Sequence, residues 1–220
     1  MAEEERREEE RRLGPAEMPN FGPPSEPRQA ASIVLLRRGG KHGQRALEVL
    51  LLKRSAEARF MPSVWVFPGG SVDQADGEGE AGARACAVRE LQEEAGIELP
   101  PEEELVLFSR WITPEVVATR FDARFYLALA PAHAPPEADG VETVEARWFE
   151  PAAAVEAADR GEIILAFPTL TQLGLLAEHR TSQAVIAAYR EGTVEPILPK
   201  VVGTREDARL LLPDDPDYPR

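Results

Sequence analysis

The stretch that decides the fold comprises residues 67–97, which read FPGGSVDQADGEGEAGARACAVRELQEEAGI. Its second half predicts a helix with one acidic face, because at about 100° per residue Glu90, Glu93 and Glu94 fall within an arc of about 100°. Apolar residues recur every three to four positions on the other side, which predicts that this side packs on a core. These residues are Ala87, Val88, Leu91 and Ala95. Gly96 then predicts a left-handed C-cap that ends the helix.

Carboxylates three and four residues apart on a helix repel one another unless a positive charge lies among them. Mg²⁺ takes carboxylate oxygens as ligands, keeps several waters and shares the rest of its shell with substrate phosphates. A glycine pair follows a predicted strand, and residues without side chains let a backbone carbonyl come close to an ion. We therefore predict a site for a divalent metal ion, with ligands from Glu90, Glu93, Glu94 and Gly70. The alternative is an acidic helix face that only meets solvent.

The order Arg-Glu-apolar-any-Glu-Glu-any-Gly-apolar at residues 89–97 resembles the Nudix box, so the chain resembles a Nudix hydrolase. The full pattern is Gly, five residues, Glu, seven residues and then this run. Residues 89–97 match at every position. Counting back from Arg89, however, places Ala81 at the position of the Glu and Ala75 at the position of the Gly. We interpret residues 74–79 as an insertion that lengthens the loop.

The resemblance assigns roles to the residues of the box. In the family the first Glu orients the other carboxylates, and we expect Glu80 to be that Glu, displaced by one position. Arg89 is expected to orient a neighbouring carboxylate, and the catalytic set is Glu90, Glu93, Glu94 and Arg89. The resemblance further implies Mg²⁺ or Mn²⁺ as cofactor, and attack of water on a diphosphate in a small nucleoside diphosphate derivative.

Residues 51–59, before the glycines, resemble the segment that precedes the box in the coenzyme A diphosphatase branch. Arg54 and Arg59 match its two arginines, whereas Met61 and Ser63 stand where that branch has His and Gly. A guanidinium binds phosphate oxygens through two parallel hydrogen bonds, so Arg54 and Arg59 are expected to bind the substrate. Gly69 is the third expected substrate-binding residue. Solvated surface arginines are the alternative.

Two further groups of residues lie after the box. The Trp-Ile-Thr-Pro and Arg-Phe-Asp runs also resemble the coenzyme A diphosphatase branch, and an adenine pocket or ordinary core packing would explain the aromatic residues Trp111, Phe121 and Tyr126. Nudix hydrolases often use a Glu near residues 141–149 as an extra metal ligand or base. Glu142 is the first candidate and Glu145 the second, against the alternative of a surface carboxylate.

The chain predicts an α/β fold, a Nudix-type α/β/α sandwich with a mixed sheet. Strands are predicted at 31–36, 47–53, 64–67, 105–112, 124–129 and 141–149, and helices after the box at 151–160, 169–178 and 182–191. Residues 1–29 are expected to form a disordered arm rich in charge and Pro. Residues 30–200 form the predicted Nudix domain, and residues 201–220 the predicted irregular tail.

Composition narrows the possible partners. A net charge of −14 argues against nucleic acid and anionic membranes. The sequence has no uninterrupted apolar segment of the ~18 residues that span a membrane and no signal-peptide pattern at its start, so a cytoplasmic protein is expected. Cys86 is expected to be a buried structural thiol, and no chemistry is assigned to the three histidines. A homodimer is plausible from the resemblance alone.

Coenzyme A or an acyl-coenzyme A is the first expected substrate, because the resemblance extends beyond the box on both sides. ADP-ribose or NADH is the alternative. A non-catalytic ligand-binding or interaction domain is the alternative from another class, favoured by Ala81 at the Glu position and opposed by the intact run at residues 89–97.

Overall fold

The computed structural model describes residues 23–39, 46–58, 61–203 and 209–219. Their central feature is an eight-stranded mixed sheet with the order β3-β2-β1-β6-β5-β8, in which β4 also pairs with β1 and β7 with β2. The pairs β1–β6 and β5–β8 are parallel and the other pairs are antiparallel. The strands are β1 (Arg28–Gly39), β2 (Ala46–Arg54), β3 (Trp65–Val66), β4 (Gly69–Ser71), β5 (Val106–Ile112), β6 (Phe121–Leu129), β7 (Thr143–Phe149) and β8 (Pro196–Ile197).

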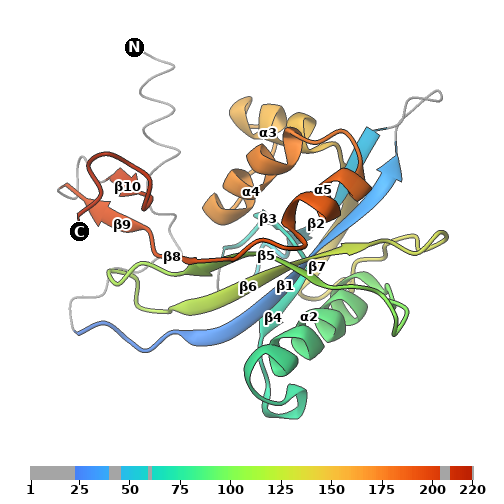
Figure 1. Ribbon diagram of the computed structural model, residues 1–220, viewed down its shortest axis with the longest axis horizontal. Helices are drawn as coiled ribbons and strands as arrows, with labels where there is room; N and C mark the ends of the chain where they lie inside the picture. The colour runs from blue at the N-terminus through green and yellow to red at the C-terminus, as the bar shows by residue number, and fades with distance from the viewer. Residues whose placement is uncertain (1–22, 40–45, 59–60, 204–208, 220) are drawn as a thin grey trace.

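Helices cover both faces of this sheet. Helix α2 (Gly79–Ala95) lies on one face, and α3 (Pro151–Asp159), α4 (Phe167–Ala177) and α5 (Ser182–Tyr189) lie on the other (Figure 1). Alternate residues of β1 enter the two cores, Ile33 and Leu35 on the α2 side and Val34 and Leu36 on the opposite side. Because both faces are buried, the central strand is apolar without interruption. The predicted α/β/α sandwich is confirmed.

The sheet splits between β1 and β2, and the split positions the site. These two strands pair only along residues 36–39 and 46–49. Beyond that point the N-terminal half of β1 pairs with β4, while β2 pairs with β3 at Leu52 and Lys53. The chain crosses the split at residues 67–68, where the Pro68 carbonyl accepts a hydrogen bond from the N–H of Ile33 at 2.9 Å. Gly69 and Gly70 therefore lie against α2.

Gly69 and Gly70 lie in strand β4, which the sequence did not predict. A Cβ at Gly69 would lie 2.5 Å from the carbonyl oxygen of Ala31 and 2.7 Å from the Cα of Ser32, both backbone atoms. At Gly70 it would lie 2.2 Å from Oε1 of Glu90. The neighbouring strand therefore requires glycine at position 69, whereas a Cβ at position 70 would meet only the end of the Glu90 side chain.

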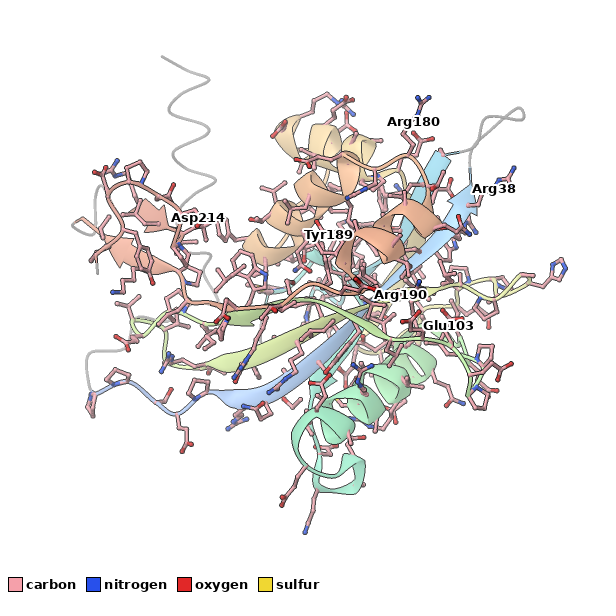
Figure 2. All side chains as sticks on the ribbon, in the orientation of Figure 1. Arg38, Glu103, Arg180, Tyr189, Arg190 and Asp214 are labelled. Carbon is pink, nitrogen blue, oxygen red and sulfur yellow. The ribbon has the colours of Figure 1, made fainter. Side chains whose placement is uncertain are left out.

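The last helices fasten the edge of the sheet. Tyr189 of α5 packs edge-on against Phe108 of β5, with ring centroids 4.7 Å apart. Arg190 follows α5 and pairs with Glu104 at 2.7 Å, close to Glu103, which lies in the same segment (Figure 2). These helices cover the sheet as the sequence predicted.

The two predicted boundaries of the domain need correction. Strand β1 begins at Arg28, and Arg120, which is buried, donates to the carbonyl of Ser25, so residues 25–29 belong to the folded part. Residues 1–22 of the predicted arm lie outside the described residues. The tail predicted to be irregular contains a two-stranded ribbon of β9 (Lys200–Val202) and β10 (Arg209–Leu211).

Among the described helices, none combines the length and the apolar character needed to cross a membrane.

Substitution of the two glycines should separate stability from site geometry. We expect Gly69→Ala to lower the free energy of unfolding by roughly 1–3 kcal/mol, because its Cβ would overlap backbone atoms that cannot move away. Gly70→Ala should cost less, since the flexible end of the Glu90 side chain can move. Urea denaturation of both variants checks this order, and equal losses would contradict it.

Candidate active site

Glu94 is the most deeply buried acidic residue of the box. Its side chain lies between α2 and β4, the residue is only 3% exposed, and Oε2 accepts a hydrogen bond from the N–H of Gly69 at 2.8 Å. Burial raises the pKa of Glu94 to about 8, although this N–H acts in the opposite direction. The nearby charge of Glu90 adds to the increase. The ionised form of Glu94 is therefore disfavoured in the metal-free chain.

The other two carboxylates of the predicted acidic face lie in different environments. Glu90 is one helical turn before Glu94 and packs where Gly70 has no side chain. Burial raises the pKa of Glu90, and the charges of Glu93 and Glu142 act in the same direction. Glu93 is 58% exposed. The face that the sequence predicted as one acidic stripe thus contains the buried Glu94, the half-buried Glu90 and the exposed Glu93.

Arg89 supplies the positive charge within the box. Its Nη1 donates to Glu90 at 2.9 Å and to Glu93 at 2.8 Å. Its Nε and Nη2 donate to the two oxygens of Asp76 at 2.9 and 2.8 Å, and Nη2 also reaches the carbonyl of Ser71 at 3.3 Å. The hydrogen bonds to Asp76 are the main cause of the raised pKa of Arg89 and of the lowered pKa of Asp76. The geometry fits the predicted orienting role of Arg89.

The expectation for Glu80 is corrected by these contacts. Glu80 does stand in the first turn of α2, but its carboxylate pairs with Arg84 at 3.0 Å and approaches Arg124 at 3.5 Å. The carboxylate before α2 that accepts hydrogen bonds from Arg89 belongs to Asp76, whose side chain is 5% exposed. Asp76 lies in the short 3₁₀ helix η1 (Gln74–Asp76).

Counting forward from Gly70 would have found Asp76. Five residues separate it from Gly70, which is the spacing of the first half of the box, with Asp in place of Glu. Twelve residues rather than seven then separate Asp76 from Arg89. The extra residues therefore follow Asp76 and do not begin at Gln74, as the backward count suggested.

Cys86 is buried beneath the same segment, as the sequence predicted. Its thiol donates towards the carbonyl of Ser71 at 3.3 Å, and burial raises its pKa to about 12. A thiol that stays protonated is a poor nucleophile, so Cys86 has a structural role.

A fourth carboxylate approaches from the loop before β7. Glu142 is exposed, and its charge is among those that raise the pKa values of Glu90 and Glu94. Its carbonyl accepts a hydrogen bond from the N–H of Ser55 at 2.8 Å, directly after the last residue of β2. Glu145, the second candidate, pairs instead with Arg147. The geometry therefore favours Glu142 over Glu145.

The predicted substrate contacts have different outcomes. Arg54 ends β2, and its charge acts on Glu94. Arg59 lies outside the described residues. Trp111 is 4% exposed and Tyr126 fully buried, which confirms core packing for these two aromatic residues, and Phe121 is half-buried.

The donor set fits a hard divalent cation. In the described parts of the chain, no three His, Cys, Asp or Glu side chains are grouped closely enough to hold an ion. Arg89 holds the carboxylates of Glu90 and Glu93 in this arrangement. The half-buried Glu90 and the buried Glu94 offer the oxygen ligands that Mg²⁺ or Mn²⁺ would take.

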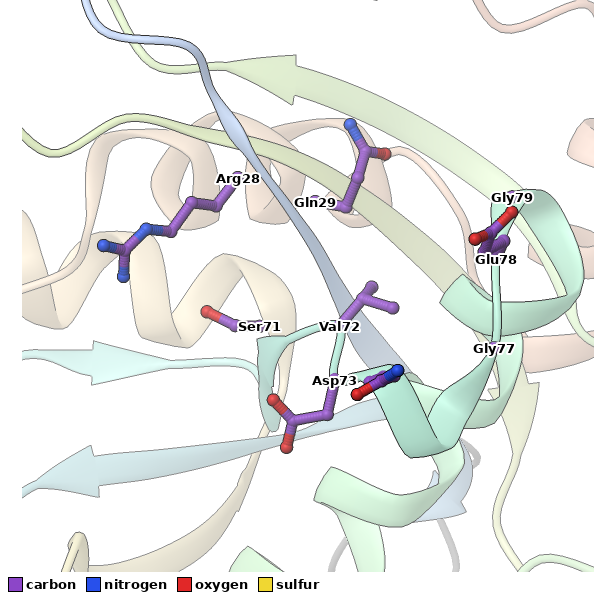
Figure 3. Close-up of a pocket in the computed structure, with 9 residues that line it drawn as sticks. Arg28, Gln29, Ser71, Val72, Asp73, Gly77, Glu78 and Gly79 are labelled. Carbon is purple, nitrogen blue, oxygen red and sulfur yellow. The ribbon is translucent and has the colours of Figure 1, made fainter.

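An open cavity of about 540 Å³ begins one residue after Gly70 (Figure 3). Ser71, Val72 and Asp73 form one wall, Arg28 and Gln29 of β1 another, and the segment after η1 closes it. Ser71 and Asp73 also approach Arg89, so the cavity adjoins the box. Its volume is in the range of small-molecule sites.

Comparison with known proteins places this geometry in a family. A family model described as NUDIX domain matches residues 26–167, which include β1 to β7, α2 and all the carboxylates described above. The Caenorhabditis elegans protein "Putative nudix hydrolase 7" is 30% identical over 185 residues, an alignment that covers 69% of this chain. The alignment covers 61% of that protein, so the chain spans about three fifths of this relative's length.

Solved structures share the fold. The crystal structure of a NUDIX hydrolase from Alicyclobacillus acidocaldarius has a TM-score of 0.67 at 22% identity, and the match covers 77% of this chain and 99% of that one. The NUDIX domain of Shewanella oneidensis NrtR, complexed with ADP ribose, has a TM-score of 0.50 at 22% identity, with 70% and 88% covered.

The raised pKa of Glu94 predicts how stability depends on pH. Its folded value of about 8 exceeds the ordinary 4.5, so ionisation is disfavoured in the folded chain. The resulting destabilisation is absent below the ordinary value, grows as pH rises and is complete above the folded value. In metal-free buffer we expect Glu94→Gln to raise the free energy of unfolding, by an amount that reaches on the order of 3 kcal/mol near pH 8.

Urea denaturation of the parent chain and the Glu94→Gln variant from about pH 5 to pH 8 measures this difference. A difference that stays constant or shrinks as pH rises would contradict a buried carboxylate.

Metal affinity should distinguish Asp76 from Glu80. We expect Asp76→Ala to weaken Mn²⁺ binding about 10-fold to 100-fold, because Arg89 would then turn fully onto Glu90 and Glu93 and occupy their oxygens. Glu80→Ala is the matched control and should change binding less than about twofold. Electron paramagnetic resonance of free Mn²⁺ measures both variants. Weaker binding in Glu80→Ala alone would restore the role first expected of Glu80.

Proposed function

The chain belongs to the NUDIX domain family, and we propose that it is a Mg²⁺-dependent hydrolase that cleaves the diphosphate linkage of a small nucleoside diphosphate derivative. The observation that carries the proposal is the neighbouring carboxylates of the half-buried Glu90 and the buried Glu94, both set against the glycine strand β4. Arg89 holds Glu90 and the N–H of Gly69 holds Glu94. A carboxylate whose ionisation is disfavoured by burial marks a candidate functional site, and a bound cation would offset that cost.

Different residues have different proposed roles in hydrolysis. Glu90, Glu93, Glu94 and the carbonyl of Gly70 would hold Mg²⁺ or Mn²⁺, which when bound supplies positive charge to the diphosphate and makes water more acidic. The N–H of Gly69 occupies Oε2 of Glu94, which leaves Oε1 for the ion. Arg89 holds the carboxylates of Glu90 and Glu93 on one nitrogen, and its charge offsets their repulsion. Glu142, exposed to solvent, serves as extra ligand or as base that takes the proton of the attacking water.

Coenzyme A or an acyl-coenzyme A is our first substrate. Arg54, which matches an arginine of that branch, lies close enough to act on Glu94, and a guanidinium there suits a diphosphate oxygen. Arg59 is proposed as a second phosphate contact, and Gly69 as a close backbone approach. The cavity after Gly70 offers room for the part of the substrate that does not react.

ADP-ribose or NADH is the second candidate, and the ADP ribose named for the Shewanella domain supports it. A non-catalytic binding domain was favoured by the missing Glu of the box. That argument is weaker because Asp76 provides a carboxylate for Arg89. A cytoplasmic location and a homodimer stay predictions.

Hydrolysis of a substrate panel tests the function. The chain is incubated with Mg²⁺ and coenzyme A, ADP-ribose, NADH or a nucleoside triphosphate, and products are separated by ion-pair chromatography. We expect coenzyme A to yield an adenosine bisphosphate and a phosphopantetheine. Glu93→Gln with Glu94→Gln should lower turnover ~10²-fold or more, because ligand charge and geometry are both lost.

Glu156→Gln, on the exposed side of α3, is the control and should retain activity. Preference for another compound would keep the mechanism and discard coenzyme A. No turnover of any compound, with unchanged ligand affinity in the double variant, would support the binding domain instead.

A further inference from the structure

The loop that carries Glu142 is attached to α2 at two points. The N–H of Glu137 donates to the carbonyl of Ala95, the last residue of α2, at 2.9 Å. Thr143 is fully buried, and its hydroxyl lies 3.1 Å from the carbonyl of Glu94. The helix that carries the acidic residues of the box therefore also sets the position of residues 137–143.

Asp139 fixes the conformation of this loop from within. Its Oδ1 accepts hydrogen bonds from the N–H groups of Val141, Glu142 and Thr143 at 2.9, 3.0 and 2.8 Å. The hydroxyl of Thr143 lies 3.2 Å from the same oxygen. One carboxylate thus holds three successive peptide N–H groups, which leaves this part of the backbone a single arrangement.

Gly140 completes the turn. It adopts the left-handed conformation with φ of +76°, and its N–H donates to the carbonyl of Thr143 at 2.8 Å. Burial acts to raise the pKa of Asp139, but the N–H groups of Thr143, Val141 and Glu142 outweigh it and lower the pKa. Asp139 is therefore an ionised acceptor at neutral pH.

This arrangement fixes the backbone of Glu142. Its N–H is held by Asp139 and its carbonyl by the N–H of Ser55, so both sides of its Cα are anchored. A long exposed side chain on a mobile loop would spread its charge over many positions. Here the charge acts on both Glu90 and Glu94.

We propose that Asp139 is a positioning residue, whose carboxylate fixes the backbone that directs Glu142 towards Glu90 and Glu94. This inference rests on the proposed function, in which Glu142 is an extra metal ligand or base. Asp139 itself contacts neither metal nor substrate in this proposal. Its whole effect passes through Glu142.

A double-variant cycle tests the inference. Asp139→Ala, Asp139→Asn, Glu142→Gln and the combination of Asp139→Ala with Glu142→Gln are compared with the parent chain. Mn²⁺ affinity is measured by electron paramagnetic resonance without substrate, and kcat and KM on the best compound of the panel. Asp159→Ala, at the exposed end of α3, is the matched control.

We expect Asp139→Ala to lower kcat or Mn²⁺ affinity ~10-fold or more, as removal of supporting groups does at metal sites, with little change in KM. Asp139→Asn should retain most of the parent value, because its amide oxygen still accepts the three N–H groups. In the Glu142→Gln background, Asp139→Ala should cause no further loss, since residues that act through one another are not additive.

Equal factors for Asp139→Ala in both backgrounds would overturn the inference while leaving the proposed function intact. So would an Asp139→Asn variant that loses as much as Asp139→Ala while its thermal midpoint stays at the parent value. A parent chain that neither binds Mn²⁺ nor hydrolyses any compound would overturn the proposed function and this inference with it.

Discussion

The acidic residues of α2 and η1 depend on the hydrogen bonds that the guanidinium of Arg89 donates to them. All five of its N–H groups have an acceptor, shared among Asp76, Glu90, Glu93 and the carbonyl of Ser71. Several carboxylates on one helix face repel each other, and removing them from water adds a cost unless a positive charge accompanies them. Lysine offers three donors on a compact ammonium group and would not reproduce this planar arrangement. Through Asp76 and Ser71, Arg89 also joins α2 to η1 and β4.

Local patterns in the sequence were sufficient for most of the architecture. The period of Ala87, Leu91 and Ala95 predicted the buried side of α2, and Gly96 does cap it with φ of +66°. Long apolar runs predicted the central strands to within a few residues. The short strand β4 escaped prediction because glycines have low strand propensity, and only the vacant edge of β1 makes them a strand. The ribbon of β9 and β10 likewise depends on pairing between segments without a strong pattern of their own.

The sequence proposed which residues belong to the candidate site, but it did not predict how the structure arranges them. A helical projection gives Glu90, Glu93 and Glu94 the same status, whereas packing against β4 buries Glu94 and leaves Glu93 exposed. Asp76 was missed because a pattern with an insertion can be counted from either end. The structure selects the count from Gly70. Asp139 had a visible signal, since Asp followed by Gly is typical of a turn, but nothing in the sequence links that turn to Glu142.

The split between β1 and β2 gives the site a composite origin. Gly69 and Gly70 belong to the half-sheet of β1, whereas Arg54 and the loop before β7 belong to the half-sheet of β2. Helix α2 lies against β1 and β4, and the loop of Glu142 is attached to its last turn. The proposed ligands Glu90 and Glu94 on α2 and Gly70 on β4 therefore stand on the half-sheet of β1, and the proposed phosphate contact Arg54 stands on the half-sheet of β2. The loop of Glu142 is attached to both. If these proposed roles hold, changes in the half-sheet of β2 would alter which molecule is accepted while the half-sheet of β1 continued to hold the ion.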